Sequence, residues 1–294
     1  MTVVSDTPRS HEHETWGVAA AYTPAHAGLH QAISDCAEVI GSRILAFDGG
    51  GAPVTHEPGP PEVFRVRPSP AGLNCGAHVV WGGMRREADA LVYDAEALIV
   101  HSLFRGHCAW AASWAARHGR PYVAIPHGCL DPWGMAQKPV AKRVWMAACG
   151  RDYLAGAAAV VFSTRRELEK ARPWIDRDDA TVIRWPVAAD LASEGVISEH
   201  RQAFRRRHDI SPDARVLLFL GRLHSLKRPR HTIAAFIDAQ PRNTILVMAG
   251  MDGDFSSTQL LAAIPAALRA VTESCRWEGY SWSGATKLPD ATPA

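Results

Sequence analysis

Long apolar runs, a leader-like start and paired cysteines are all missing from this 294-residue sequence. No run approaches the roughly 18 uninterrupted apolar residues that a membrane-spanning helix needs. The first residues do not combine a cationic segment with an apolar one, so they do not resemble a signal peptide. We therefore expect a cytoplasmic protein.

The cysteine spacing and the charge balance argue against a metal-binding and a nucleic-acid-binding protein. Six cysteines are scattered without a C-x-x-C pair or a Cys/His ligand spacing, which predicts reduced core residues and no metal site. The formal net charge of +2 is too balanced to indicate a nucleic-acid partner. One local exception is RQAFRRRHD at 201–209, which we interpret as a solvated helix face, the alternative being contact with an anionic membrane or a partner.

Alternating strand and helix patterns fill the first two thirds of the chain. Short apolar runs with polar, Gly or Pro boundaries are typical of strands buried on both faces. Predicted strands lie at 17–24, 43–51, 63–69, 97–104, 121–128, 158–164 and 181–187. Predicted helices lie at 28–40, 107–119, 141–157 and 165–174, and the Pro/Gly-rich stretch at 49–62 is a predicted loop. The alternation predicts a parallel sheet covered on both sides, a Rossmann-like domain over 1–197.

A polar helix in 198–213 is the predicted linker to a second domain over 214–294. The alternation restarts there, with predicted strands at 215–221, 244–250 and 275–280. A doubly wound domain of five or six strands usually takes roughly 150 residues. The second Rossmann-like domain is therefore predicted to be incomplete.

The stretch FLGRLHSLKRPRHTIAAF at 219–236 has the ingredients of an anion site. A predicted strand ends in Gly221 and Arg222, Lys227 follows in a short loop, and a helix is predicted to begin at Pro229. A helix amino terminus offers free N–H groups and the positive end of its dipole. Glycine lets a ligand approach the backbone, and arginine can grip two phosphate oxygens. A solvated turn is the alternative interpretation of these residues.

Two segments resemble one protein family. The stretch at 219–236 is similar to the phosphate loop of family-4 (group 1) retaining glycosyltransferases, and IPHGCLDPWGMAQ, at the start of 125–171, is similar to their His-Gly segment. The HG-x-LDPW form resembles members that build exopolysaccharide or lipopolysaccharide.

The resemblance implies the GT-B fold, two Rossmann-like domains facing each other across a cleft that holds a nucleotide-sugar. It implies transfer of a hexose, with retention of configuration, to a cell-surface glycan or a lipid-linked acceptor. The resemblance implies no metal ion or other cofactor. It also implies peripheral contact with the inner membrane.

The same resemblance implies roles for individual residues. Gly221, Arg222 and Lys227 would bind the donor diphosphate, and His127 would be catalytic, contacting the donor sugar near the reacting carbon. A lone histidine could simply bond a loop carbonyl, but the Pro-His-Gly-x-x-Asp context favours function.

Other candidates flank these residues. We interpret His101 and His107, which flank another strand end, as structural. Ser163 and Glu167 match the family pattern, but helix capping explains them as well.

The sequence departs from the family in its second domain. A spaced pair of glutamates that holds the donor in the family does not occur before residue 294, so we expect a truncated relative. The alternative function is therefore that of a catalytically inactive homologue, a nucleotide-sugar-binding or interaction protein. A nucleotide-sugar epimerase ranks last, because those enzymes lack the Gly-Arg-x-x-x-x-Lys loop in this form.

Overall fold

The computed structural model of the chain describes residues 14–19, 22, 28–47, 54–66, 82–185, 194–250, 252–256, 259–260 and 275–279. The chain divides into two compact units, Met1–Ala188 and Ala189–Ala294. Each has its own sheet, helices and buried core.

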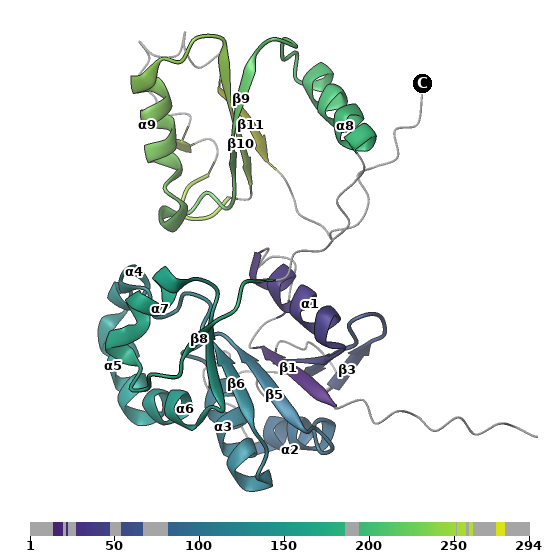
Figure 1. The fold of residues 1–294 in the computed structure, drawn as a ribbon, viewed down its shortest axis with the longest axis vertical. Coiled ribbons are helices and arrows are strands. Elements are labelled where there is room, and N and C mark those ends of the chain that lie inside the picture. The colour runs from purple at the N-terminus through teal and green to yellow at the C-terminus, as the bar shows by residue number, and fades with distance from the viewer. Residues whose placement is uncertain are drawn as a thin grey trace, which may run out of the picture. The chain divides into compact units, whose positions relative to one another are not determined.

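The first unit is built on an eight-stranded sheet with the order β3-β4-β2-β1-β5-β6-β7-β8 (Figure 1). Neighbouring strands run parallel except for the antiparallel pair β3 and β4. The strands are β1 Thr15–Ala19, β2 Arg43–Ala46, β3 Val54–Glu57, β4 Val63–Val66, β5 Ala97–His101, β6 Tyr122–Ile125, β7 Ala159–Phe162 and β8 Thr181–Val182. The predicted parallel α/β architecture is confirmed.

Helices cover both faces of this sheet. They are α1 Gly28–Ile40, α2 Gly82–Leu91, α3 Gly106–His118, α4 Pro132–Ala136, α5 Pro139–Trp145, α6 Arg151–Gly156 and α7 Arg165–Ala171. On one face, Trp114 of α3 and Tyr153 of α6 are fully buried against strand residues such as Leu98. On the other face, Ile33 of α1 packs with Ile44 of β2. The apolar runs are therefore buried from two sides, as parallel strands require.

Strand β3 corrects the predicted loop at 49–62. Val54–Glu57 forms the sheet edge and pairs with β4 in an antiparallel register that sets His56 opposite Phe64. The two rings stack with centroids 4.4 Å apart. All four β3 residues are half-buried or exposed, so an edge strand here leaves no continuous apolar run in the sequence.

The helix predicted at 141–157 is interrupted by a π-helical turn, Met146–Gly150, between α5 and α6. A Cβ on Gly150 would lie 2.5 Å from the Trp145 ring and 2.7 Å from the Met146 sulfur. Glycine is needed there because these side chains lie against its backbone. Helical periodicity in the sequence cannot reveal the extra residue that a π turn contains.

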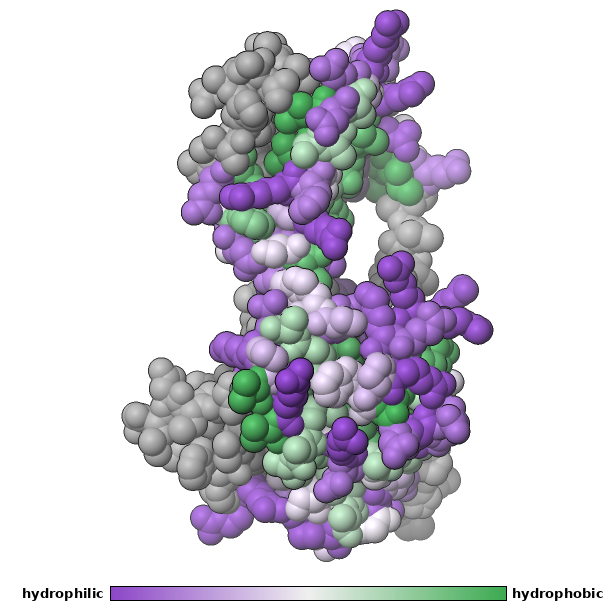
Figure 2. All heavy atoms as spheres, turned by 90° about the vertical axis from the view of Figure 1, so that its left-hand side faces the viewer, coloured by the Kyte–Doolittle hydropathy of each residue, from purple (hydrophilic) through white to green (hydrophobic). Residues whose placement is uncertain are grey.

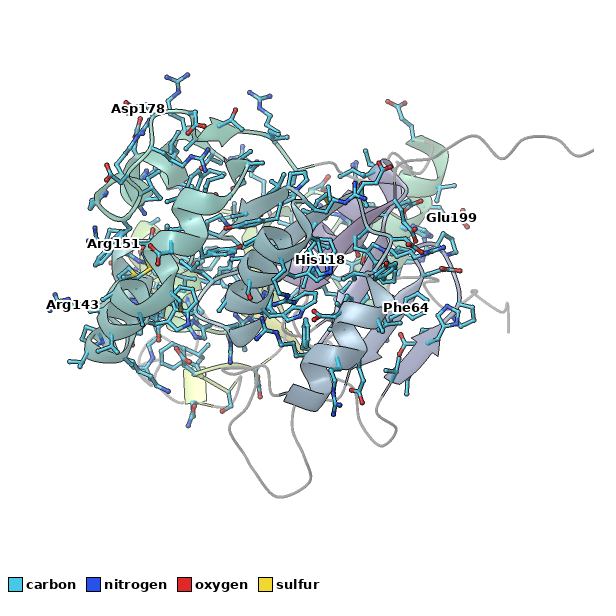
Figure 3. The ribbon with its side chains drawn as sticks, turned by 90° about the horizontal axis from the view of Figure 1, so that it is seen from below. Phe64, His118, Arg143, Arg151, Asp178 and Glu199 are labelled. Carbon is cyan, nitrogen blue, oxygen red and sulfur yellow. The ribbon has the colours of Figure 1, made fainter. Side chains whose placement is uncertain are left out.

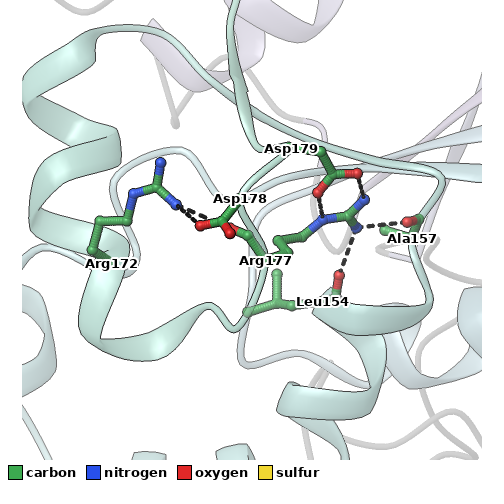
Figure 4. Close-up of polar contacts among 6 residues, drawn as sticks. All are labelled: Leu154, Ala157, Arg172, Arg177, Asp178 and Asp179. Carbon is green, nitrogen blue, oxygen red and sulfur yellow. Dashed lines mark hydrogen bonds and ion pairs between the residues drawn. The ribbon is translucent and has the colours of Figure 1, made fainter.

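Arg177 fixes the segment that leads into β8 (Figure 4). Its Nε and Nη2 donate to the two carboxylate oxygens of Asp179 at 2.5 and 2.6 Å. Its Nη1 donates to the carbonyls of Leu154 and Ala157 at 3.1 and 2.6 Å, at the end of α6. One side chain thus satisfies terminal helix carbonyls and holds the start of β8 in place.

The second unit has a three-stranded parallel sheet in its described part, with the order β11-β10-β9. Its elements are β9 Arg215–Leu220, β10 Thr244–Gly250, β11 Cys275–Gly279, α8 Glu194–Arg207, a 3₁₀ turn at Ser225–Lys227 and α9 Pro229–Ala239. Ile233 and Phe236 of α9 pack on Met248 at one face.

The other face of β10 meets α8, the helix that the sequence places in the linker. Val247 is buried here with Ile210 and Ala214, and Phe204 of α8 packs against this group. Phe204 thus fastens an otherwise polar helix to the second unit.

Strand β9 is exposed where its sequence is most apolar. Leu218 and Leu220 are 59% and 72% exposed, and Leu217 is 49% exposed. Within the described part, β10 is the one strand that pairs with β9, so its other edge carries no strand. An uncovered edge of this kind is a hazard for association with other chains.

Candidate functional site

The sequence-predicted site residues lie at the carboxyl ends of strands in both units. His127 follows β6 in the first unit, whereas Gly221, Arg222 and Lys227 follow β9 in the second. Ligands of open α/β sheets bind beyond this edge.

His127 occupies a sharp turn at the end of β6. Its φ is +49°, and that of Gly128 is +74°, so two consecutive residues adopt left-handed conformations. Such a conformation is uncommon for a residue with a Cβ and is often found at functional sites. The turn leaves the His127 side chain half-buried, in contact with its neighbours on the same sheet edge.

The His127 ring lies between two other rings. On one side is Trp185, which stacks with a centroid distance of 4.8 Å and an interplanar angle of 9°. On the other is His101, the last residue of β5, at 5.2 Å. Nδ1 of His101 and Nε2 of His127 are 2.9 Å apart, a hydrogen bond between the two rings. Sequence reasoning assigned His101 a structural role and missed Trp185; the structure brings both into contact with His127.

His101, His107 and His127 form a histidine cluster, in which Nε2 of His107 lies 2.8 Å from the His101 carbonyl oxygen. Burial keeps all three rings neutral at pH 7. Desolvation lowers the pKa of His127 to about 4, with the Glu167 carboxylate opposing the shift. Desolvation also lowers the pKa of His107 to about 4 and, helped by the neighbouring histidines, that of His101 well below its usual range. A neutral imidazole can donate one hydrogen bond and accept another. His127 can therefore orient a hydroxyl group, but it supplies no positive charge.

Glu167 ties the His127 turn to the next strand end. One carboxylate oxygen accepts from the Gly128 N–H at 2.7 Å, and the other accepts from the N–H and hydroxyl of Ser163 at 2.9 and 2.5 Å. Its own N–H donates to Thr164, the N-cap of α7. Both Glu167 oxygens are thus engaged within the protein, so the residue acts as a scaffold and helix cap.

The loop after β9 places Gly221 and Lys227 together. The Lys227 side chain crosses Gly221, and a Cβ there would lie 3.9 Å from its Cγ. Arg222 and Lys227 are both exposed, and neither has a hydrogen bond or ion pair from its side chain within the described residues. The structure therefore leaves two cations available beside a glycine at a strand end.

The end of strand β10 lies against the loop after β9, a contact not predicted from the sequence. A Cβ on Gly250 would lie 1.9 Å from the Gly221 carbonyl oxygen, and the φ of Gly250 is +154°. The ends of β9 and β10 approach so closely that only glycine fits.

Asp254 then fastens the loop. It accepts from the N–H of Ser225 at 2.9 Å and from its hydroxyl, and it lies 3.2 Å from Nε2 of His224. The Ser225 bonds are the main cause of its lowered pKa, with His224 and Arg222 adding to the shift. The Gly/Asp-rich run after β10 in the sequence is typical of a turn and could have indicated this support.

Helix α9 begins where the sequence predicts, with Pro229 in its first turn and Arg228 as a left-handed N-cap without a side-chain cap bond. A helix start of this kind leaves backbone N–H groups without partners inside the helix. Together with Arg222 and Lys227, it forms an electropositive end of the second sheet.

Among the residues that the structure describes, no group of three or more His, Cys, Asp or Glu is placed to hold a metal ion. In that part of the chain, no helix is both long and apolar enough to cross a bilayer.

Comparison with known proteins identifies the fold. No protein-family model and no curated protein sequence matches the chain. Among solved structures, a glycosyltransferase from Rickettsia africae has a TM-score of 0.55 at 12% identity, covering 90% of this chain and 68% of its own. A UDP-forming α,α-trehalose-phosphate synthase from Burkholderia vietnamiensis has a TM-score of 0.54 at 11% identity, with 92% and 74% covered.

A third similar structure comes from another class of enzyme. UDP-GlcNAc 2-epimerase from Neisseria meningitidis, bound to UDP-GlcNAc, has a TM-score of 0.51 at 12% identity and covers 91% of this chain and 72% of its own. At such identities the likeness concerns the fold alone. The chain has the fold of GT-B proteins, built from two Rossmann-like units.

Proposed function

We propose that the protein is a glycosyltransferase that transfers a hexose from a nucleotide-sugar. The observation that carries the proposal is the β9 loop, where exposed Arg222 and Lys227 flank Gly221 at the start of a helix. The similar structures support it, because one is named as a glycosyltransferase, one as a UDP-forming trehalose-phosphate synthase, and the third is bound to a nucleotide-sugar.

The proposed roles follow from the charge that develops during the reaction. As the bond between the anomeric carbon and the diphosphate breaks, negative charge grows on the leaving phosphate. Arg222 and Lys227 would stabilise it through charge-assisted hydrogen bonds, with Gly221 allowing close backbone approach. The new bond forms between the anomeric carbon and the oxygen of an acceptor hydroxyl, and the hydroxyl proton passes to the released nucleoside diphosphate.

His127 would contact the donor sugar as a hydrogen-bonding group. Its neutral ring is held by His101 and Trp185, so its direction is set before a ligand binds. Preorganisation of this kind lowers the cost of orienting a substrate.

The finer parts of the proposal rest on the family resemblance. They are retention at the anomeric carbon, a cell-surface glycan or lipid-linked acceptor, and work in the cytoplasm beside the inner membrane. No metal ion is proposed.

Nucleotide binding is the first test. Calorimetry with UDP, GDP and ADP should find a ligand for the wild-type protein, and Arg222→Ala should weaken it by about 1.5 to 3 kcal/mol, the scale of a charge-assisted contact. Arg242→Ala is the matched control, an exposed arginine that precedes β10 and so lies at the opposite end of the strands. Equal affinity in the wild type and Arg222→Ala would remove Arg222 from the site.

Product analysis then separates the candidate activities. The alternatives are an inactive nucleotide-sugar-binding protein and, ranked after it, an epimerase, an enzyme class that has a similar fold. Incubation with UDP-glucose or UDP-GlcNAc and a lipid-linked acceptor should release UDP and lengthen the acceptor. An altered sugar still attached to UDP would instead indicate an epimerase, and binding without any product would indicate a binding protein.

A further inference from the structure

The segment from Pro132 to Arg151 contains no acidic residue, although it carries Lys138, Lys142, Arg143 and Arg151. It forms α4, α5 and the π turn on one side of the first unit (Figure 1). Asp131, which precedes it, is already paired with Lys170. No carboxylate within the segment offsets this charge, although exposed Asp152 directly follows it.

Apolar side chains are exposed within this cationic segment. Val140 and Val144, one helical turn apart on α5, are 72% and 62% exposed, and Trp133 is 40% exposed. Helix α5 has no buried residue at all. Figure 2 faces this side of the first unit, and green apolar side chains lie beside purple hydrophilic ones on it.

The inner side of α5 is attached to the body of the unit by other residues. Nζ of Lys142 donates to the Gly134 carbonyl at 2.5 Å and lies 5.1 Å from the centre of the Phe104 ring. Trp145 packs edge-on against the same ring at 5.3 Å. The valines are therefore held outward by a fixed helix.

The cations extend from the same side. In Figure 3, Arg143 and Arg151 lie at one edge of the unit, with the Arg143 side chain reaching away from it. Lys138 and Arg143 are exposed, and the described residues give neither of them an ion-pair partner. We call Trp133, Lys138, Val140, Arg143 and Val144 the α4–α5 surface.

We propose that the α4–α5 surface binds an anionic lipid bilayer, which deepens the proposed function by naming the surface that would contact the membrane. Cations around exposed valine and tryptophan side chains match a membrane interface, where apolar groups enter the headgroup boundary and cations meet acidic lipids. A stable protein interface usually covers about 800 Å² on each partner, more than three exposed apolar side chains provide. Charge of one sign with small apolar anchors thus favours a lipid surface over a protein.

Sedimentation with lipid vesicles tests the proposal without any need for sugar transfer. The full-length protein should pellet with vesicles of phosphatidylglycerol and phosphatidylcholine, and much less with phosphatidylcholine alone. Added salt should release it, because exposed charges are screened. The assay is independent of the proposed activity, so failure of one does not decide the other.

Paired substitutions locate the contact. Lys138→Gln with Arg143→Gln should weaken vesicle binding about tenfold or more, given the usual contribution of each cation near an acidic bilayer. Val140→Ser with Val144→Ser should also weaken it. Circular dichroism and thermal unfolding would verify that each variant is folded.

The control lies on the other basic segment. Arg206→Gln with Arg207→Gln on α8, both exposed, should leave vesicle binding unchanged. Wild-type protein that stays in the supernatant with acidic vesicles would overturn the proposal, as expected if the surface binds an acidic protein instead. Loss of binding in the α8 variant but not in the α5 variants would also overturn it.

Discussion

At the scale of single residues, His127 shows what sequence can and cannot supply. The Pro-His-Gly context at the end of a predicted strand indicated a turn at a sheet edge, and the structure has that turn. The rings on either side of His127 come from segments far away in sequence, Trp185 and His101. Contacts between such segments depend on strand order, which apolar periodicity does not encode.

His101 should determine which nitrogen of His127 carries the proton. Neither Nε2 of His101 nor Nδ1 of His127 has a hydrogen-bond partner among the described residues, so one of the two must carry an N–H without an acceptor from the protein. That N–H costs less on the half-buried His127, which water can reach, than on His101, which is 2% exposed. The proton of His101 should therefore sit on Nδ1 and be donated to Nε2 of His127, which leaves the proton of His127 on its own Nδ1.

Nitrogen-15 chemical shifts of the His127 ring would measure this. In the wild type they should report Nδ1–H, the less common tautomer, and His101→Phe should shift them towards Nε2–H. His101→Gln, which retains a donor, is the matched variant and should preserve much of the wild-type pattern. A wild-type ring protonated on Nε2 would show that the proposed direction of the bond is wrong.

At the scale of elements, the loop after β9 could be predicted because the residues that define it have local conformational preferences. Glycine and arginine at a strand end, a lysine and a proline at a helix start are local signals, and α9 begins at Pro229 as expected. The support from the next loop is not local. Gly250 and Asp254 act through the pairing of β10 with β9, a register that only the folded sheet defines.

Gly250→Ala should separate the two strand ends. The added Cβ would overlap the Gly221 carbonyl, and the residue would keep a φ that side chains rarely adopt. We expect a loss of at least about 2 kcal/mol in the free energy of unfolding of the second unit and weaker nucleotide binding. Urea unfolding and calorimetry would measure the two effects.

The control for this substitution is Gly195→Ala in α8, where a Cβ would meet nothing within 4 Å. Its stability should stay equal or rise by up to about 1 kcal/mol, because alanine favours a helix. A Gly250→Ala variant that is as stable as the wild type would contradict the close approach of the two strands.

At the scale of the whole molecule, the alternation of apolar runs and helical spacing predicted the fold class. Two α/β units were expected and are present. The edge strand β3, the π turn and the exposed leucines of β9 were not predictable. Each depends on which other element packs against the segment, and the local sequence does not encode that contact.

Acid should destabilise the first unit before the second, because the described histidines whose pKa values folding lowers, His101, His107 and His127, belong to it. The pKa values of His107 and His127 fall from 6.5 to about 4 on folding, so the unfolded chain takes up their protons first as pH decreases. Stability should therefore be full above pH 6.5 and fall towards pH 4, by about 3 kcal/mol for each of these two histidines.

Urea unfolding followed by tryptophan fluorescence, at pH 7 and at intervals down to pH 5, would measure this decline. Most of the ten tryptophans lie in the first unit and would report on it. The variant His107→Gln should be less stable at pH 7 but show a flatter decline. Stability that stays constant or increases over this range would contradict the neutral, buried state of the cluster.

The π turn between α5 and α6 has a consequence for how the α4–α5 surface could have arisen. A π turn holds one residue more than an α turn, so inserting a single codon into a regular helix would produce it. Residues on either side of an inserted position differ in direction by about 100° from their places in an uninterrupted helix. Tyr153 and Leu154 of α6 are buried, whereas Val140 and Val144 face outward. One inserted codon could thus change the orientation of an entire helical segment while leaving the core residues beyond it in place.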